Sequence, residues 1–377
     1  MEPQRKRSVR EAMLEGLDDI KWKDLKHAFG SAADVPANLR GLCAEPGAAA
    51  HKEALQALCG SIYHQGTVYE ATPYAVPFLI EIARSPSTHD REGVLALIEA
   101  IAGGLNSYPV EKHLQESRQA IKQHLDSLFD LLQDQSPAIR IGAAHVIVRF
   151  PEEYEKIETE FLHLLEKESS ELFRAGILYL FGRLSKVSDN VLPLLLNAGD
   201  GNRLLERQAS HIAIAMLNPP NLSEEAKDMV IETLICEDMV GDLKALPWDI
   251  EGEVAAFDFL ASLEQASREK CVAKLIRTIK NGEGNHHQVE KMMNLVFGER
   301  GALLQKADPA EKVKSIEELT EQQRDVLKLF VDIYDVPNDK GIFYGSPCRW
   351  HLPGKARDLR TLLEPKRSWW ANLFKSS

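Results

Sequence analysis

Few residues of this chain have the types and spacing that catalysis needs, and one group of them surrounds His64. Tyr63, Tyr69 and Glu70 stand close to this histidine in the sequence. A histidine near a carboxylate can be tuned across neutral pH, so the group could transfer protons as a general acid or base. Alternatively, the side chains of His64 and Gln65 could bond to the backbone of a tight turn, which Gly66 allows, and we favour that interpretation.

Cysteine and histidine spacing gives little support to a metal site. Cys348 and His351 form a Cys-x-x-His pair, and His286 and His287 could add two ligands, but zinc sites normally show two ligand pairs at recognisable spacing. The sequence also has no Gly-rich phosphate loop, nucleophile elbow or His-Glu-x-x-His motif. We therefore expect a protein that is not an enzyme, with no catalytic residue, no metal and no cofactor.

An acidic stretch around Trp248 is the best candidate for a binding surface. Between Asn221 and Gln265, twelve acidic residues stand against Lys227 and Lys244, which gives 2 − 12 = −10. A tryptophan beside carboxylates can anchor an arginine or lysine of a partner, or it can fold onto an apolar groove between helices. The predicted protein-binding residues are Glu237, Asp238, Asp242, Trp248, Asp249, Glu251 and Glu253 here, with His64, Gln65, Tyr69, Glu70 and Tyr74 as a second set.

The elements that position these residues follow from a repeat. Arg140, Arg174 and Arg207 begin three similar segments, RIGAAHVIVRF, RAGILYLFGRL and RQASHIAIAML, which are 174 − 140 = 34 and 207 − 174 = 33 residues apart. A fourth copy begins at Arg91 and a weaker one at Lys52. Large apolar residues recur seven and ten positions after the arginine, which places them on one helix face. Two positions after it stands a small residue (Gly142, Gly176, Ala209), which lets a neighbouring helix approach closely.

Each arginine-led segment is preceded by another amphipathic run, such as HLDSLFDLLQD from His124 or YEKIETEFLHLLEKE from Tyr154. A helix pair of this length cannot bury its apolar face alone, so such pairs stack on their neighbours. The predicted fold is all-α: an α-solenoid of antiparallel helix pairs over residues 1–340. The repeats are clearest over 50–220 and divergent over 221–340, and residues 341–377 form an irregular basic segment that ends in a capping helix.

The order Asp134, Pro137, Arg140 followed by small residues resembles the HEAT family, in particular its short lyase-type bacterial members. Residues 63–79 also resemble a stretch of bacterial HEAT-repeat proteins without an assigned activity. The tetratricopeptide and ankyrin patterns do not match these copies. The resemblance implies an armadillo-like superhelix in which each repeat arginine bonds to an acidic residue of a neighbouring repeat.

Composition limits where the protein works and what it binds. The formal net charge of −12 argues against a nucleic-acid partner, because phosphates attract cations. No apolar run is long enough to span a membrane, and the charged start carries no leader, so we expect a cytoplasmic protein. The apolar stripe of the tail could touch a membrane surface, but we expect it to cap the last repeat; its residues are Trp369, Trp370, Leu373 and Phe374.

Together these patterns predict a non-catalytic solenoid that binds another protein with a basic surface, without nucleic acid and without stable membrane association. An immunity or antitoxin-type inhibitor of a basic toxin domain is the specific hypothesis, because an acidic rigid surface steers a basic partner and blocks it. A generic scaffold or assembly factor is the close alternative. A HEAT-like enzyme that acts on nucleic acid, or a lyase-like relative, is the rival from another class.

Overall fold

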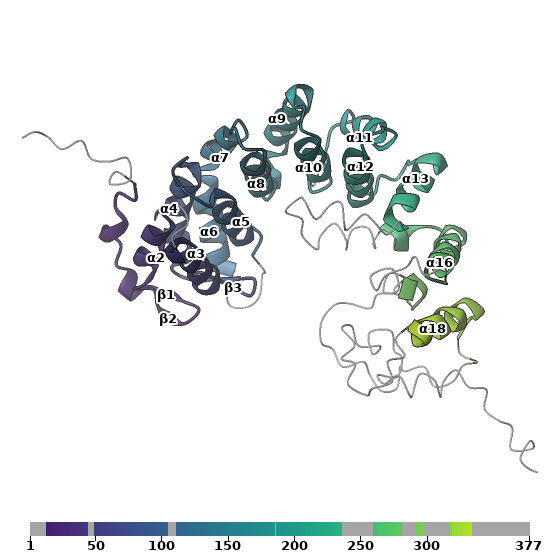
Figure 1. Cartoon of the computed structure of the whole chain (residues 1–377), viewed down its shortest axis with the longest axis horizontal. Helices are drawn as coiled ribbons and strands as arrows, with labels where there is room; N and C mark the ends of the chain where they lie inside the picture. The colour runs from purple at the N-terminus through teal and green to yellow at the C-terminus, as the bar shows by residue number, and fades with distance from the viewer. Residues whose placement is uncertain are drawn as a thin grey trace, which may run out of the picture. The chain divides into compact units, whose positions relative to one another are not determined.

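The structure is a computed structural model that describes residues 13–43, 49–104, 111–184, 186–235, 259–280, 292–293, 295–297, 317 and 319–333. Most of these residues are helical, which confirms the predicted all-α class (Figure 1). Their β-structure consists of two short hairpins. Two compact units follow one another along the chain, the first ending at Leu217 and the second beginning at Asn218.

Eleven described α-helices make up most of the first unit. They are α2 (Val35–Leu42), α3 (Ala49–Ser61), α4 (Thr72–Arg84), α5 (Arg91–Ala102), α6 (Glu111–Lys122), α7 (Leu125–Leu131), α8 (Pro137–Ile147), α9 (Tyr154–Lys167), α10 (Glu171–Phe181), α11 (Val191–Gly199) and α12 (Leu204–Leu217). Short 3-10 turns at Leu17–Asp19, Trp22–Asp24 and Pro151–Glu153 accompany them.

The arginine-led segments are helices, but most of them begin before the arginine. Helices α8, α10 and α12 start three residues ahead of their arginines, whereas α5 starts at Arg91 itself. Local chemistry sets these starts: Asp90 caps α5 by accepting the N–H of Gly93 at 2.8 Å, and Pro137 opens α8, where a missing N–H is harmless. Ser170 caps α10 in the same way, through the N–H of Phe173.

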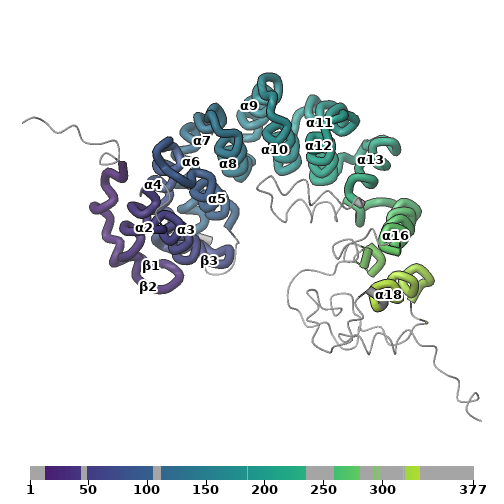
Figure 2. The backbone as a smooth tube through the Cα atoms, viewed as in Figure 1, coloured from purple at the N-terminus to yellow at the C-terminus, as the bar shows by residue number. Residues whose placement is uncertain are grey.

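The arginine-led helices form one layer, in which α5 packs on α8, α8 on α10, and α10 on α12 (Figures 1 and 2). A second set covers them: α4 and α6 on α5, α7 on α8, α9 on α10, and α11 on α12. The core lies between the two sets. Ile147, Phe181 and Ile214, at the predicted offset of seven, are fully buried, whereas Leu217 at offset ten stays half-exposed.

Small residues at offset two allow the close packing that the repeat predicts. A Cβ on Gly93 would lie 2.6 Å from the Leu55 side chain of α3, and a Cβ on Gly142 would lie 3.1 Å from the Leu95 side chain of α5. Real Cβ contacts are rarely that short, so a larger side chain would push these helices apart. The helix layer therefore requires its glycines.

The second unit contains α13 (Glu224–Ile235), α16 (Gln265–Lys280) and α18 (Glu321–Ile333). Helix α13 packs on α16, with Val230, Leu234 and Leu275 buried. The predicted capping helix of the tail, with Trp369, Trp370, Leu373 and Phe374, lies outside the described residues, as does the rest of 341–377.

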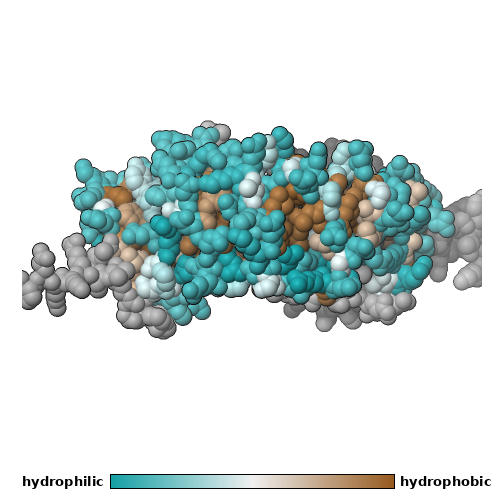
Figure 3. Space-filling view, turned by 90° about the horizontal axis from the view of Figure 1, so that it is seen from above, coloured by the Kyte–Doolittle hydropathy of each residue, from teal (hydrophilic) through white to brown (hydrophobic). Residues whose placement is uncertain are grey.

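The surface alternates between hydrophilic and apolar regions, and Figure 3 shows apolar residues in a broken band between hydrophilic ones. Helix α11 is among the apolar elements, because its half-exposed face carries Leu192, Leu194 and Leu196. Within the described part of the chain, no helix combines the length and the apolar character that crossing a lipid bilayer requires.

Candidate functional site

The predicted binding residues divide between described and undescribed parts of the chain. Glu237, Asp238, Asp242, Trp248, Asp249, Glu251 and Glu253 lie outside the described residues, so the acidic stretch around Trp248 stays a prediction. The second set of predicted residues lies in the first unit: His64 and Gln65 in a hairpin, Tyr69 and Glu70 between that hairpin and α4, and Tyr74 in the first turn of α4.

This hairpin pairs β3 (Tyr63–His64) with β4 (Thr67–Val68). Its turn residues Gln65 and Gly66 both have positive φ, at 50° and 86°, which is the geometry of the tight turns that suit β-hairpins. The predicted turn at Gln65-Gly66 is therefore confirmed. Thr72 is the first residue of α4, and its hydroxyl donates to the carbonyl of Ile62 at 2.6 Å and accepts the N–H of Tyr69 at 2.8 Å.

A second hairpin, which the sequence did not reveal, lies beside the first. It pairs β1 (Lys26–His27) with β2 (Gly30–Ser31). Two backbone hydrogen bonds join the first hairpin to residues on either side of the second: Ala28 donates to Ser61, the last residue of α3, at 3.1 Å, and Ala71, just before α4, donates to Lys26 at 3.0 Å. These bonds hold the two hairpins beside each other.

Phe29, at the tip of the first hairpin, is 72% exposed and is the most exposed large apolar side chain among the described residues. Its ring meets the ring of His64 edge-on, with centroids 5.4 Å apart. The N–H of Phe29 donates to Nδ1 of His27 at 3.0 Å, and Nε2 of His27 bonds to Asp34 at 2.9 Å. The backbone of Phe29 is thus held in place, while its apolar ring stands mostly in water. We call Phe29, His64 and Gln65 the hairpin surface.

The acid–base interpretation of His64 gains no geometric support. Among the described residues, His64 contacts Phe29 through its ring and makes no hydrogen bond with Glu70. Tyr74 stands 47% exposed on α4, and Tyr69 and Glu70 are half-buried. The five predicted residues therefore lie in one region, but only His64 and Gln65 belong to the hairpin surface.

Three of the repeat arginines bond to acidic residues of the chain, as the resemblance implies. Arg91 binds Asp134 at 2.7 Å, Arg140 binds Glu168, and Arg174 binds Glu206 at 2.7 Å, each an acid of the following repeat. Each of these arginines also donates to a backbone carbonyl that ends a preceding helix or follows it: Ala83, Asp134 and Leu165 respectively. One side chain thus joins a helix end to the next repeat.

The acidic partners are stabilised as carboxylates. Burial alone would raise the pKa of Asp134, but hydrogen bonds from Arg91 and from the N–H of Ser136 outweigh burial and hold that pKa below its ordinary value. For Glu168, too, burial opposes the shift, and the N–H of Ser170 together with Arg140 lowers the pKa. These carboxylates bind the chain itself and are not available to a partner.

A further pair of arginines stands nine residues after the repeat arginines, at Arg149 and Arg183. Arg149 bonds to Glu99 at 2.6 Å, and Arg183 lies 3.5 Å from the same carboxylate with 4% of its side chain exposed. Arg118 donates to the carbonyls of Ala102 and Arg149. The spacing of 183 − 149 = 34 could have revealed this pair. Its cations are committed to protein acceptors and form no open basic groove.

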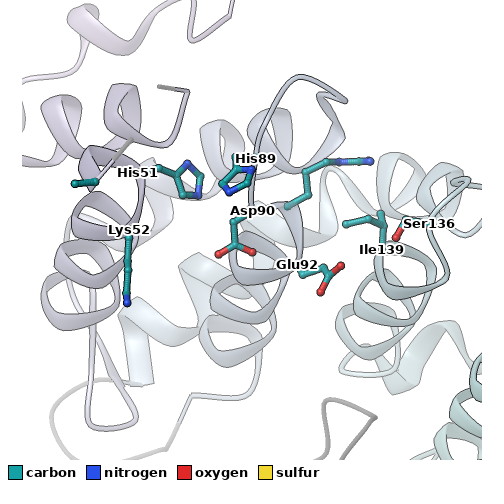
Figure 4. Close-up of a pocket in the computed structure, with 9 residues that line it drawn as sticks. His51, Lys52, His89, Asp90, Glu92, Ser136 and Ile139 are labelled. Carbon is teal, nitrogen blue, oxygen red and sulfur yellow. The ribbon is translucent and has the colours of Figure 1, made fainter. Parts of the chain in front are cut away.

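A polar cleft of about 690 Å³ lies where the first turns of α3, α5 and α8 meet (Figure 4). His51 and Lys52 come from α3, and Ser136 and Ile139 come from the start of α8. The start of α5 contributes His89, Asp90, Arg91 and Glu92. The rings of His51 and His89 meet edge-on with centroids 5.9 Å apart.

His51 is the buried member of this cleft, with 3% of its surface exposed, whereas His89 is exposed. No sequence motif marks the cleft, because its residues come from three repeats. Within the described ranges, His, Cys, Asp and Glu side chains form no group of three arranged to hold a metal ion.

Comparison with known proteins adds no relative: the chain matches no protein-family model and no curated protein.

Proposed function

We propose that this chain is a HEAT-like α-solenoid that works without catalysis by binding another protein, and that the hairpin surface is one of its contact sites. The layered helix pairs of the first unit support the solenoid. Arg–acid links between successive repeats support it as well, because they join each helix pair to the next.

The observation that carries the binding proposal is the exposed ring of Phe29. Burying a phenylalanine side chain stabilises a protein or a complex by roughly 1.5–3 kcal/mol, so leaving it 72% in water forgoes most of that gain. The backbone that carries the ring is held in place, because the N–H of Phe29 bonds to His27, His27 bonds to Asp34, and two backbone bonds join the first hairpin to Ser61 and Ala71. Aromatic side chains are typical anchors of protein–protein interfaces.

For the partner, a basic protein domain fits best, and an inhibitor of a basic toxin domain is the finer hypothesis. Support comes from the charge of the acidic stretch and from the net charge of −12. A scaffold or assembly factor with the same surface is the alternative. The nucleic-acid rival gains no support from Arg149 and Arg183, because both cations bind protein acidic groups.

Affinity purification from the native host tests this proposal. We expect the wild-type chain to retain a specific protein. Phe29→Ser should retain at least about tenfold less of it, since an anchor residue contributes about 2 kcal/mol or more. Leu204→Ser is the matched control: Leu204 is also an exposed apolar residue, at 42%, but it lies at the start of α12. Equal retention by all three proteins would refute the hairpin surface as the contact site.

A further inference from the structure

We propose that the polar cleft at the starts of α3, α5 and α8 binds a cationic side chain, an arginine guanidinium, presented by another protein. Only the source of the arginine rests on the proposed protein-binding function. The chemistry of the cleft depends on its own residues, and the hairpin surface plays no part in it.

The buried ring of His51 supplies one hydrogen-bond acceptor to the cleft. Its Nδ1 lies 2.9 Å from the carbonyl oxygen of Leu42, and a carbonyl oxygen can only accept. Nδ1 therefore carries the proton, and in the neutral ring Nε2 is an acceptor. That Nε2 is buried and has no hydrogen-bond partner among the described residues. Leaving a buried acceptor without a hydrogen bond costs free energy. A ligand that donates an N–H to Nε2 would remove this cost.

Carboxylates supply the next acceptors. Oδ1 of Asp90 accepts the N–H of Gly93 at 2.8 Å, which leaves further lone pairs on this carboxylate. Glu92 is exposed at the same helix start and forms no ion pair within the described residues. Figure 4 shows the His51 ring directed toward His89 and Asp90, with Glu92 on the other side of Asp90.

The cations of the cleft do not offset these acceptors. Arg91 is committed, because its Nη2 binds Asp134 at 2.7 Å and its Nε donates to the carbonyl of Ala83 at 2.6 Å. Lys52 extends away from His89 and Asp90 in Figure 4. Helix N-termini favour anions, but Asp90 already caps α5, and Asp134 accepts the N–H of Ser136. An incoming anion would meet Asp90 and Glu92, whereas a cation would pair with them.

Guanidinium geometry fits the cleft better than an ammonium does. Its planar group directs five N–H donors outward and stacks on flat rings, so it can bond to Asp90 and to Nε2 of His51 while lying against His89. A cavity of about 690 Å³ lies within the range of sites that hold small ligands. His89 is exposed and can turn aside to admit the group.

Nα-acetyl-L-arginine amide, titrated into the full chain and followed by the ring ¹H–¹⁵N signals of the histidines, tests the proposal. We expect saturable shifts at His51 and His89. The citrulline analogue has nearly the same shape without the charge, and its affinity should be at least about tenfold lower. Asp90→Asn should also weaken arginine amide about tenfold while keeping thermal stability, because asparagine caps a helix as well as aspartate does.

Two further variants complete the test. Glu92→Gln should lower the affinity for arginine amide without affecting the cap of α5. Lys52→Gln should leave that affinity unchanged. The absence of saturable shifts in the wild-type chain would overturn the proposal. So would binding of inorganic phosphate that Asp90→Asn strengthens, because the cleft would then be an anion site. Phe29→Ser should leave the binding of arginine amide unchanged. The proposal for the cleft and the proposal for the hairpin surface can therefore fail independently.

Discussion

The link between Arg174 and Glu206 should be among the most stabilising polar contacts of the first unit. Nε of Arg174 lies 2.7 Å from Oε1 of Glu206, and Nη2 lies 3.2 Å from Oε2, which makes a two-point contact. The side chains are 22% and 7% exposed, so water screens them little. Arg174 also donates to the carbonyl of Leu165 at the end of α9. Arg174→Met removes all three bonds and keeps much of the side-chain volume.

Breaking one partner of a buried pair costs roughly 3–5 kcal/mol. Arg203, which also bonds to Glu206 at 2.8 Å, retains part of the charge compensation, so we expect about 3 kcal/mol for Arg174→Met. For a unit of this size that loss lowers the melting temperature by roughly 6–12 °C. Circular dichroism during thermal and urea unfolding would measure both quantities.

Two comparisons make this test decisive. The double variant Arg174→Met/Glu206→Gln should lose less than the sum of the single losses, by about 1–3 kcal/mol, because the two groups interact. Arg84→Met is the matched control: its pair with Asp130 is 3.5 Å long with side chains 49% and 71% exposed, and it should cost less than about 1 kcal/mol. A loss for Arg174→Met no larger than for Arg84→Met would refute the structural role of the repeat arginines.

Two other residues test the packing of the same unit. Burial, with a smaller contribution from Arg207, lowers the pKa of His211 from 6.5 to about 4, so the unfolded chain binds the proton first as the pH falls. Stability should therefore drop by about 3 kcal/mol between pH 6.5 and 4, and His211→Leu should remove that slope in urea unfolding followed across pH. Gly182→Ala would place a Cβ 2.7 Å from the backbone of Ala213 and should cost about 1–3 kcal/mol in thermal unfolding. Gly60→Ala, on a helix with open space around it, should be neutral or stabilising by up to about 1 kcal/mol; a loss there equal to that of Gly182→Ala would contradict the packing argument.

The periodic part of the fold could be predicted because periodicity directly reflects burial. Apolar residues at offsets of seven and ten fall on one helix face, and Ile98, Ile147 and Phe181 are buried accordingly. The role of the repeat arginine followed from the resemblance to the HEAT family, but the position of its acidic partner did not: Asp134 and Glu168 stand six residues before the next arginine, whereas Glu206 stands one residue before it. Helices α8 and α10 begin three residues before their arginines, because a proline opens α8 and a serine cap opens α10.

The two proposed binding sites could not be predicted in the same way, since they depend on contacts between residues distant in sequence. Phe29 is an unremarkable aromatic in the sequence, and only the pairing of the two hairpins places it against His64. The cleft joins His51 to Asp90 across a separation of 90 − 51 = 39 residues, and no motif spans that distance. A turn at Gln65-Gly66 was predictable from local sequence, because glycine adopts the positive φ of a tight turn without steric cost.

The way in which this chain uses its arginines determines the charge that it presents to a partner. Arg91, Arg140 and Arg174 each bind a backbone carbonyl and a carboxylate of the chain, and Arg149 and Arg183 share Glu99. Each ion pair cancels one basic charge with one acidic charge, so pairing inside the fold does not change the excess of 57 acidic over 45 basic residues. Because Arg91, Arg140 and Arg174 are bound in this way, their charges are not presented separately to a partner. Approach of a basic protein should therefore be favoured, and raising the salt concentration should slow that approach.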